Sequence, residues 1–388
     1  MAQTAFLAPT IYTPRPISNG VLLTEDDRIR AVGTRDEIEI PTNARVVQLE
    51  DGFMITPGFI DTHNHGAGGH DVMETSRESL DAVCRTLARL GTTSYYPTTL
   101  TAPTLDIRRA VEFLAGYLEE AEKRPAAMSH PLGIHMEGPY ISVKRRGVHP
   151  AAHIVEPTLA AYRQFAEAAR GKLRIMTVAP ELKHAPDLIR EMIGTGVQPS
   201  MGHTDSTFEQ AEQAVELGVR QATHMFNAMR PFTHRDPGVI GKVLNDPTIK
   251  AELIADGVHV DPQAIQLLYR CKGADGIVLI SDGLSAVGAP EGTYRVGGLT
   301  IEVKDGVCRH NGTLAGSILT IARAVRNMRD FVGLPLEEAI QMGTLNTAQL
   351  MGISERKGCL KPGADADLVI LDQQLSVRQV YARGLPVE

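Results

Sequence analysis

Two histidines separated by one residue, His63 and His65, stand out among the side chains able to carry chemistry. They follow the apolar run 53–60. Alternate side chains of a strand point to the same side, so both imidazoles would face one metal ion. A hydrolytic metal site is therefore the first hypothesis, although such pairs also occur on solvated strand ends.

Four further metal-type side chains follow short apolar segments later in the chain. They are Glu137, His203, His224 and Asp282. Each alone has an ordinary explanation: a turn residue, a helix start, a core histidine or a helix cap. Their combination of nitrogen and oxygen donors suits Zn²⁺ or another divalent transition ion.

Short apolar segments alternate with longer helical stretches from residue 55 onward. Eight strands are predicted at 55–61, 93–98, 132–137, 172–178, 197–201, 221–225, 250–255 and 276–281, with helices at 79–90, 105–123, 158–170, 185–194, 208–217 and 262–272. This alternation favours a TIM-type (β/α)₈ barrel over an open sheet. Catalytic groups of such barrels lie at the C-terminal ends of strands, which is where the metal-type residues fall.

Both ends of the chain contain short β-rich runs separated by turn signals. We expect residues 1–57 and 358–388 to build one small β-sandwich domain beside a catalytic barrel of residues 58–357. Within the barrel part, an inserted hairpin is predicted at 292–308, and two helices are predicted to follow it to about residue 351.

Composition narrows the function classes. The 388 residues carry a formal net charge of −7, which argues against a general nucleic-acid or anionic-membrane surface and favours a small-molecule partner. No run approaches the roughly 18 apolar residues that span a bilayer, and the start lacks a signal-peptide pattern. Four dispersed cysteines indicate neither a thiolate zinc site nor a disulfide framework, so a cytoplasmic location is expected.

Five segments carry a family resemblance. They are PGFIDTH at 57–63, GIHMEGPY at 133–140, ATHMFNAM at 222–229, IADGVHV at 254–260 and LAGS at 314–317. With them the chain resembles the metal-dependent amidohydrolase superfamily and, within it, the N-acetylglucosamine-6-phosphate deacetylases. The resemblance covers nearly the whole chain. It implies hydrolysis of N-acetylglucosamine-6-phosphate to glucosamine-6-phosphate and acetate, in amino-sugar catabolism and recycling.

The resemblance also implies a metal site. Glu137, His203 and His224 would bind the main divalent ion. Zinc is the expected metal, and iron, manganese and cobalt are the alternatives. Some members of the family lack the histidines of the first strand, whereas His63 and His65 are intact here. One bound ion is expected. Whether a second ion binds at His63 and His65, with Glu137 bridging the two ions and Asp282 as a further ligand, stays open.

An acetamide resists water because its carbonyl is resonance-stabilised and its amine leaves poorly. A divalent ion would lower the pKa of bound water toward about 7 and polarise the carbonyl. Asp282 would take the proton from that water and deliver it to the departing amine. By resemblance, His149 reaches the substrate and helps to polarise the carbonyl.

Substrate recognition is likewise implied by the resemblance. Asn227 and Ala228 would contact the phosphate, and His259 would contact the bound sugar phosphate. Arg235 would add a charge-assisted pair, supplied by the neighbouring subunit of a homodimer. The basic run 144–146 indicates either solvated charges or a mobile loop near the sugar.

Three other functions compete with this interpretation. Dihydroorotases, hydantoinases and isoaspartyl dipeptidases often use a carboxylated lysine at the end of the fourth strand, but segment 176–181 contains none. N-acetylgalactosamine-6-phosphate differs from the favoured substrate only in the orientation of one hydroxyl, so it stays open as an alternative substrate. A catalytically silent scaffold is disfavoured because every expected metal ligand is present.

Overall fold

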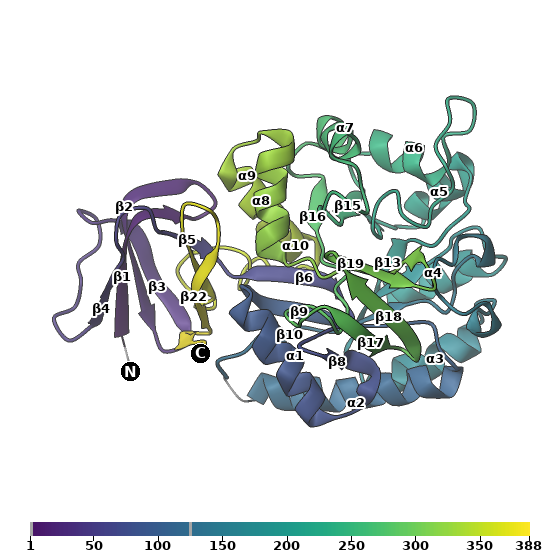
Figure 1. Cartoon of the computed structure of the whole chain (residues 1–388), viewed down its shortest axis with the longest axis horizontal. Helices are drawn as coiled ribbons and strands as arrows, with labels where there is room; N and C mark the ends of the chain where they lie inside the picture. The colour runs from purple at the N-terminus through teal and green to yellow at the C-terminus, as the bar shows by residue number, and fades with distance from the viewer. Residues whose placement is uncertain (1–2, 124–125) are drawn as a thin grey trace.

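The computed structural model describes residues 3–123 and 126–388 and shows a small β domain beside a larger barrel (Figure 1). Eight parallel strands form the barrel: β6 (Phe59–Asn64), β9 (Thr92–Thr99), β11 (Ile134–Glu137), β12 (Leu173–Val178), β13 (Gln198–Met201), β14 (Gln221–Ala222), β15 (Lys250–Leu253) and β16 (Ile277–Leu279). They pair in this order. The predicted (β/α)₈ barrel is confirmed.

The barrel closes where the chain leaves β16 and meets β6. The backbone N–H of Asp282 donates to the carbonyl of His63 at 3.0 Å, and that of His65 donates to the carbonyl of Gly283 at 2.8 Å. The hydroxyl of Ser281 also donates to the carboxylate of Asp61. This seam places the two histidines of the first strand beside the aspartate that follows the eighth.

Helices surround the barrel. They are α1 (Arg77–Arg89), α2 (Thr104–Lys123), α3 (Leu159–Ala168), α4 (Ala185–Gly194), α5 (Phe208–Glu216), α6 (Gly238–Asn245), α7 (Pro262–Lys272), α8 (Ile321–Val332), α9 (Leu336–Met342) and α10 (Leu345–Leu350). The sequence did not predict α6, because glycine disfavours helix and α6 contains Gly238 and Gly241. Three helices follow residue 320 where two were expected, because the chain breaks twice: Gly333 ends α8 at a φ of 75°, and Gly343 and Thr344 separate α9 from α10.

The predicted strand 55–61 is in fact two strands in two sheets. β5 (Met54–Pro57) belongs to the small domain, and β6 begins the barrel after Gly58. A Cβ at Gly58 would lie only 2.0 Å from the hydroxyl of Thr93. Glycine is therefore required where the chain passes between the two sheets.

The small domain is built from both ends of the described chain. Its strands are β1 (Gln3–Tyr12), β2 (Pro16–Glu25), β3 (Arg28–Thr34), β4 (Arg45–Gln48), β5, β21 (Leu368–Leu371), β22 (Val377–Ala382) and β23 (Leu385–Pro386). β5 pairs parallel with β1 and antiparallel with β21. Phe6 of β1 and Tyr381 of β22 are separated by two strands, yet their ring centroids lie 4.8 Å apart. Neighbouring strands are about 4.8 Å apart, so the sheet folds over this core, and the expected β-sandwich is confirmed.

The insertion after the eighth strand is larger than the predicted hairpin. It has four antiparallel strands, β17 (Gly292–Val296), β18 (Leu299–Lys304), β19 (Val307–His310) and β20 (Thr313–Leu314). Asn311 and Gly312, both at positive φ, form a third two-residue turn of the kind that hairpins prefer, after those at 297–298 and 305–306. Shorter pieces are β7 (Gly66–Ala67), β8 (His70–Asp71), β10 (His130–Pro131) and 3₁₀ turns at 72–74, 143–145 and 151–153.

Among the described helices, none combines the length and the apolar character required to cross a membrane.

A buried ion cluster ties the start of β3 to the returning C-terminal segment. The Asp365 side chain is fully buried and pairs with Arg28, with Arg356 at 3.1 Å and with Lys357 at 2.9 Å. Burial alone would raise the pKa of Asp365, but Lys357, Arg356 and Arg28 hold it below its usual value. The stabilisation is complete above the pKa of an unfolded aspartate and is lost as the pH falls through the lowered folded value.

We predict that Asp365→Asn lowers the free energy of unfolding by about 3–5 kcal/mol, because it leaves a buried lysine and two arginines short of a counter-charge. Chemical denaturation at neutral pH measures this loss. The matched control is Glu355→Gln, which removes the exposed 2.9 Å pair with Lys361 and should cost less than about 0.5 kcal/mol. Equal losses in the two variants would contradict the assignment.

Candidate active site

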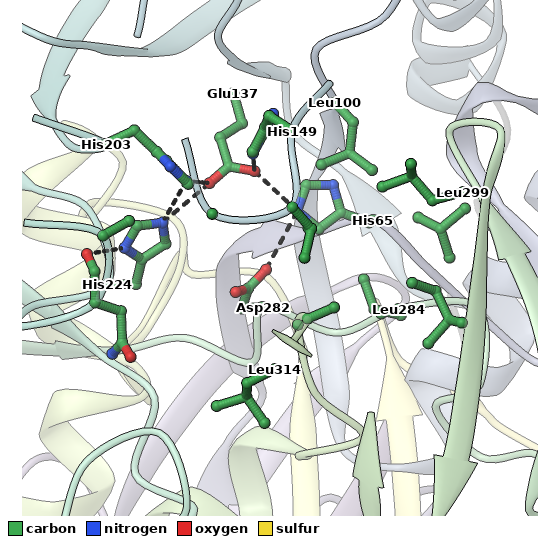
Figure 2. A pocket seen from close by; sticks show the side chains of 18 of the residues that line it. His65, Leu100, Glu137, His149, His203, His224, Asp282, Leu284, Leu299 and Leu314 are labelled. Atoms are coloured by element: carbon green, nitrogen blue, oxygen red, sulfur yellow. Dashed lines mark hydrogen bonds and ion pairs between the residues drawn. The ribbon is translucent and has the colours of Figure 1, made fainter. Parts of the chain in front are cut away.

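One buried carboxylate lies at the centre of the candidate site. Glu137 ends β11 and is 3% exposed. Its Oε1 lies 3.0 Å from Nε2 of His203 and 3.0 Å from Nε2 of His224, and these two nitrogens are 3.1 Å apart (Figure 2). The structure therefore brings together the three residues that were expected to bind the main ion.

The histidine pair of the first strand forms a second group next to the first. Nε2 of His63 and Nε2 of His65 are 3.1 Å apart, and Oδ1 of Asp282 lies 3.5 Å from the former and 3.2 Å from the latter. Glu137 reaches this group too, with its Oε1 3.4 Å from His63 and its Oε2 3.4 Å from His65. One carboxylate thus contacts both groups.

Backbone carbonyls fix the ring orientation of three of these histidines. Nδ1 of His65 donates to the carbonyl of Thr98 at 2.8 Å. His203 and His224 donate in the same way to the carbonyls of Arg145 and Asn227, at 2.8 and 3.2 Å. A carbonyl only accepts, so each Nε2 keeps its lone pair for a cation. Ligands of a tetrahedral zinc ion lie about 3.3 Å apart, so the donor atoms fit a divalent ion.

His149 is oriented in the opposite sense. The backbone N–H of Thr101 donates to its Nδ1 at 3.3 Å. A neutral His149 therefore carries its hydrogen on Nε2, which lies 3.3 Å from Oε2 of Glu137. His149 is arranged as a hydrogen-bond donor to the pocket rather than as a metal ligand.

Carboxylates control the charge of the site. Burial alone would lower the pKa of His63, but Glu137 and Asp282 raise it well above its usual value. Asp282 and Glu137 likewise raise the pKa of His65 to about 9 against the effect of burial. The two carboxylates thus favour the protonated, positively charged form of these imidazoles. A bound divalent ion would supply positive charge to the carboxylates in place of those protons.

Four residues of the site that are not glycine adopt left-handed backbone conformations. His203, His224, Ala228 and Asp282 have φ values of 46°, 29°, 50° and 47°. Such conformations cost roughly 1–3 kcal/mol each, and they cluster where function constrains the chain. His203 lies shortly after the end of β13, and Asp282 lies shortly after the end of β16. The left-handed turn at each position directs the side chain into the site. Sequence reasoning missed these turns because the residues in the left-handed conformation are not themselves glycine.

The two groups border a pocket with one polar and one apolar side. His259, Asn227 and Ala228 also line this pocket, and Nδ1 of His259 lies 2.6 Å from the carboxylate of Asp256. Leu100, Leu284 and Leu299 lie together on one side of the pocket (Figure 2). They pack with Val296 and Ile301 into an aliphatic wall, and Leu314 also lines the pocket. Most of these residues come from the inserted sheet. Sequence reasoning missed this wall, although the alternation of Leu299, Ile301 and Val303 gave a signal for it.

Arg235 is not part of this pocket. It is exposed on the loop that precedes α6, and the described residues that line the pocket do not include it. Within one chain, the structure therefore does not bring Arg235 to the other predicted substrate contacts.

The basic run 144–146 has a structural role that the sequence did not reveal. Lys144 and Arg145 pair with Asp205 at 3.3 and 2.7 Å, and Arg146 donates to the carbonyl of His149 at 2.9 Å. The Asp205 side chain is only 12% exposed. These contacts hold the loop of His149 against the segment that follows His203, so the run is not simply solvated.

We predict that Asp205→Asn loosens this loop, because it removes the counter-charge of two basic residues. Cleavage by trypsin at 144–146 should become roughly fivefold faster, as expected for the loss of about 1 kcal/mol from partly exposed pairs. Asp187→Asn removes an exposed 3.0 Å pair with Arg190 on α4 and should leave that rate unchanged. An unchanged rate in Asp205→Asn would show that the pairs do not hold the loop.

The sequence is similar to those of known amidohydrolases. A model of the amidohydrolase family matches residues 54–387. The chain is 41% identical over 341 residues to an N-acetylglucosamine-6-phosphate deacetylase of Lysinibacillus sphaericus, with 87% of each protein covered. It is 37% identical over 339 residues to an N-acetylgalactosamine-6-phosphate deacetylase of Escherichia coli O157:H7, with 87% of this chain and 89% of that protein covered.

The likeness extends to solved structures. A mutant N-acetyl-D-glucosamine-6-phosphate deacetylase from Mycobacterium smegmatis, in complex with N-acetyl-D-glucosamine-6-phosphate, matches the fold with a TM-score of 0.92. The identity is 32%, and the match covers 100% of both chains. The similarity therefore includes the small β domain as well as the barrel.

Proposed function

The chain belongs to the amidohydrolase family, and we propose that it hydrolyses N-acetylglucosamine-6-phosphate to glucosamine-6-phosphate and acetate. The observation that carries the proposal is the position of Glu137, whose carboxylate contacts His203 and His224 on one side and His63 and His65 on the other. We place the enzyme in the cytoplasm, in amino-sugar catabolism and recycling.

Glu137, His203 and His224 would hold the main divalent ion, with zinc favoured over iron, manganese or cobalt by the nitrogen-rich donor set. A bound ion would polarise the acetamide carbonyl and make hydroxide available near neutral pH. His63, His65 and Asp282 offer donors for a second ion.

Two side chains of the pocket are suited to the remaining chemistry. Asp282, 13% exposed, would accept the proton of the attacking water and later donate it to the amine that leaves. His149 would donate its Nε2 hydrogen to the carbonyl oxygen as negative charge develops there. Both residues line the pocket beside Glu137.

Asn227, Ala228 and His259 would bind the sugar phosphate on the polar side of the pocket. Arg235 is exposed, which suits a residue that reaches the site of a neighbouring subunit. We therefore propose a homodimer in which each chain supplies Arg235 to its partner's phosphate site.

An assay of amine release tests the function. We expect turnover of N-acetylglucosamine-6-phosphate, loss of turnover after chelation and recovery when Zn²⁺ is restored. The second candidate substrate, N-acetylgalactosamine-6-phosphate, is included because of the similarity to the Escherichia coli enzyme. No amine release from either phosphorylated sugar by the metal-loaded protein would refute the proposal.

We predict that Asp282→Asn lowers turnover by about 10²–10⁴-fold, because the amide cannot accept and return the proton. Steady-state kinetics with measured metal content give the result. The main ion should be retained, since Asp282 lies with the other group of ligands. Retained turnover in this variant would assign proton transfer to another residue.

We predict that Arg235→Ala raises KM for the phosphorylated sugar much more than for N-acetylglucosamine, because it removes a charged partner of the phosphate. Arg190→Ala is the matched control, since Arg190 is an exposed arginine on α4 that pairs with Asp187, and it should leave both KM values unchanged. Equal effects of Arg235→Ala on the two substrates would argue against phosphate binding.

A further inference from the structure

Glu252 is a fully buried carboxylate beside the candidate metal site that the proposed reaction leaves without a role. It lies on β15 and is 0% exposed. Its Oε1 accepts from the hydroxyl of Thr62 and from the side-chain amide of Gln221, both at 2.6 Å. Both donors are neutral, and Oε2 has no hydrogen-bond partner among the described residues. A buried carboxylate in this state needs a further donor or a positive charge.

The ring of His63 faces that free oxygen. Nδ1 of His63 lies 3.8 Å from Oε2 of Glu252, and it too has no hydrogen-bond partner within the described ranges. A movement of about 1 Å would join the two atoms in a charge-assisted hydrogen bond. The other three histidines that were expected to bind metal, His65, His203 and His224, donate from Nδ1 to backbone carbonyls, so His63 differs in facing a carboxylate.

The other imidazole near this position is already engaged. The ring of His135 packs against that of His63 with centroids 4.7 Å apart. Its Nδ1 donates to the carbonyl of Thr62, and its Nε2 bonds with the hydroxyl of Thr177, both at 2.9 Å. Neither nitrogen is left for Glu252, so His63 is the partner that the geometry provides.

We propose that Glu252 is a positioning residue that makes His63 a ligand for a second divalent cation, held together with His65 and Asp282. By accepting the Nδ1 hydrogen, Glu252 keeps the lone pair of His63 on Nε2, 3.1 Å from Nε2 of His65. A carboxylate in this position also increases the basicity of the ligand. The inference rests on the metal dependence of the proposed function and not on its substrate.

Glu252→Gln tests the proposal with little change of shape. Glutamine can still accept from Thr62 and Gln221 through Oε1, but it presents an N–H₂ group to Nδ1 of His63. The ring must then carry its hydrogen on Nε2, which faces the cation. Chelated wild-type and variant proteins are titrated with Co²⁺ by calorimetry, and bound ions are counted by elemental analysis.

We expect two binding steps in the wild-type protein. In Glu252→Gln the weaker step should lose about 10–100-fold in affinity, while the stronger step changes by less than about twofold. Ring ¹⁵N chemical shifts of His63 should show the hydrogen on Nε2 in the variant. These measurements use no substrate, so they stand or fall independently of the deacetylase activity.

Thr62→Val is the matched control, since it removes a donor to Oε1 but leaves Oε2 facing His63. A purely structural role of Glu252 predicts that both variants lose the second ion alike, whereas positioning predicts that Thr62→Val keeps it. Thermal melting of the chelated proteins confirms that both variants fold. The proposal is overturned by unchanged binding in Glu252→Gln, by equal losses in the two variants or by a single binding step in the wild-type protein.

Discussion

The candidate site depends on one constraint, the burial of the Glu137 carboxylate among imidazole rings. Its two oxygens lie 3.0 to 3.4 Å from Nε2 of five histidines. A buried charge is tolerated only when donors or cations surround it in fixed directions. The carbonyls that hold His65, His203 and His224 by their far nitrogens supply those directions, and the strained turns place the rings.

Closure of the barrel and assembly of the site are the same event. His63 and His65 come from the first strand and Asp282 from the end of the eighth, and these segments meet only when β6 pairs with the chain after β16. Asp61 and Ser281 join across that seam just below the site. The most distant barrel strands in sequence therefore carry neighbouring functional groups.

The barrel and the members of its central cluster could be predicted because both follow from local patterns. Alternating apolar runs mark the strands, and polar residues at their ends are brought to one face by parallel topology. What escaped prediction depends on contacts between distant segments. The pairing of Arg145 with Asp205 has no local signal, and neither has the buried carboxylate of Glu252 inside an apolar strand. The split at Gly58 was hidden because β5 and β6 read as one continuous apolar run.

The pairing of β5 with β21 has a consequence for synthesis on the ribosome. β5 leads from the small domain into the barrel, and its antiparallel partner β21, which pairs with it over four residues, is made only after the whole barrel. Until then one edge of β5 has no partner, and such edges invite association with other chains. The small domain can reach its native sheet only after translation of the barrel is complete. Nascent chains therefore carry an unpaired strand edge throughout the synthesis of the barrel.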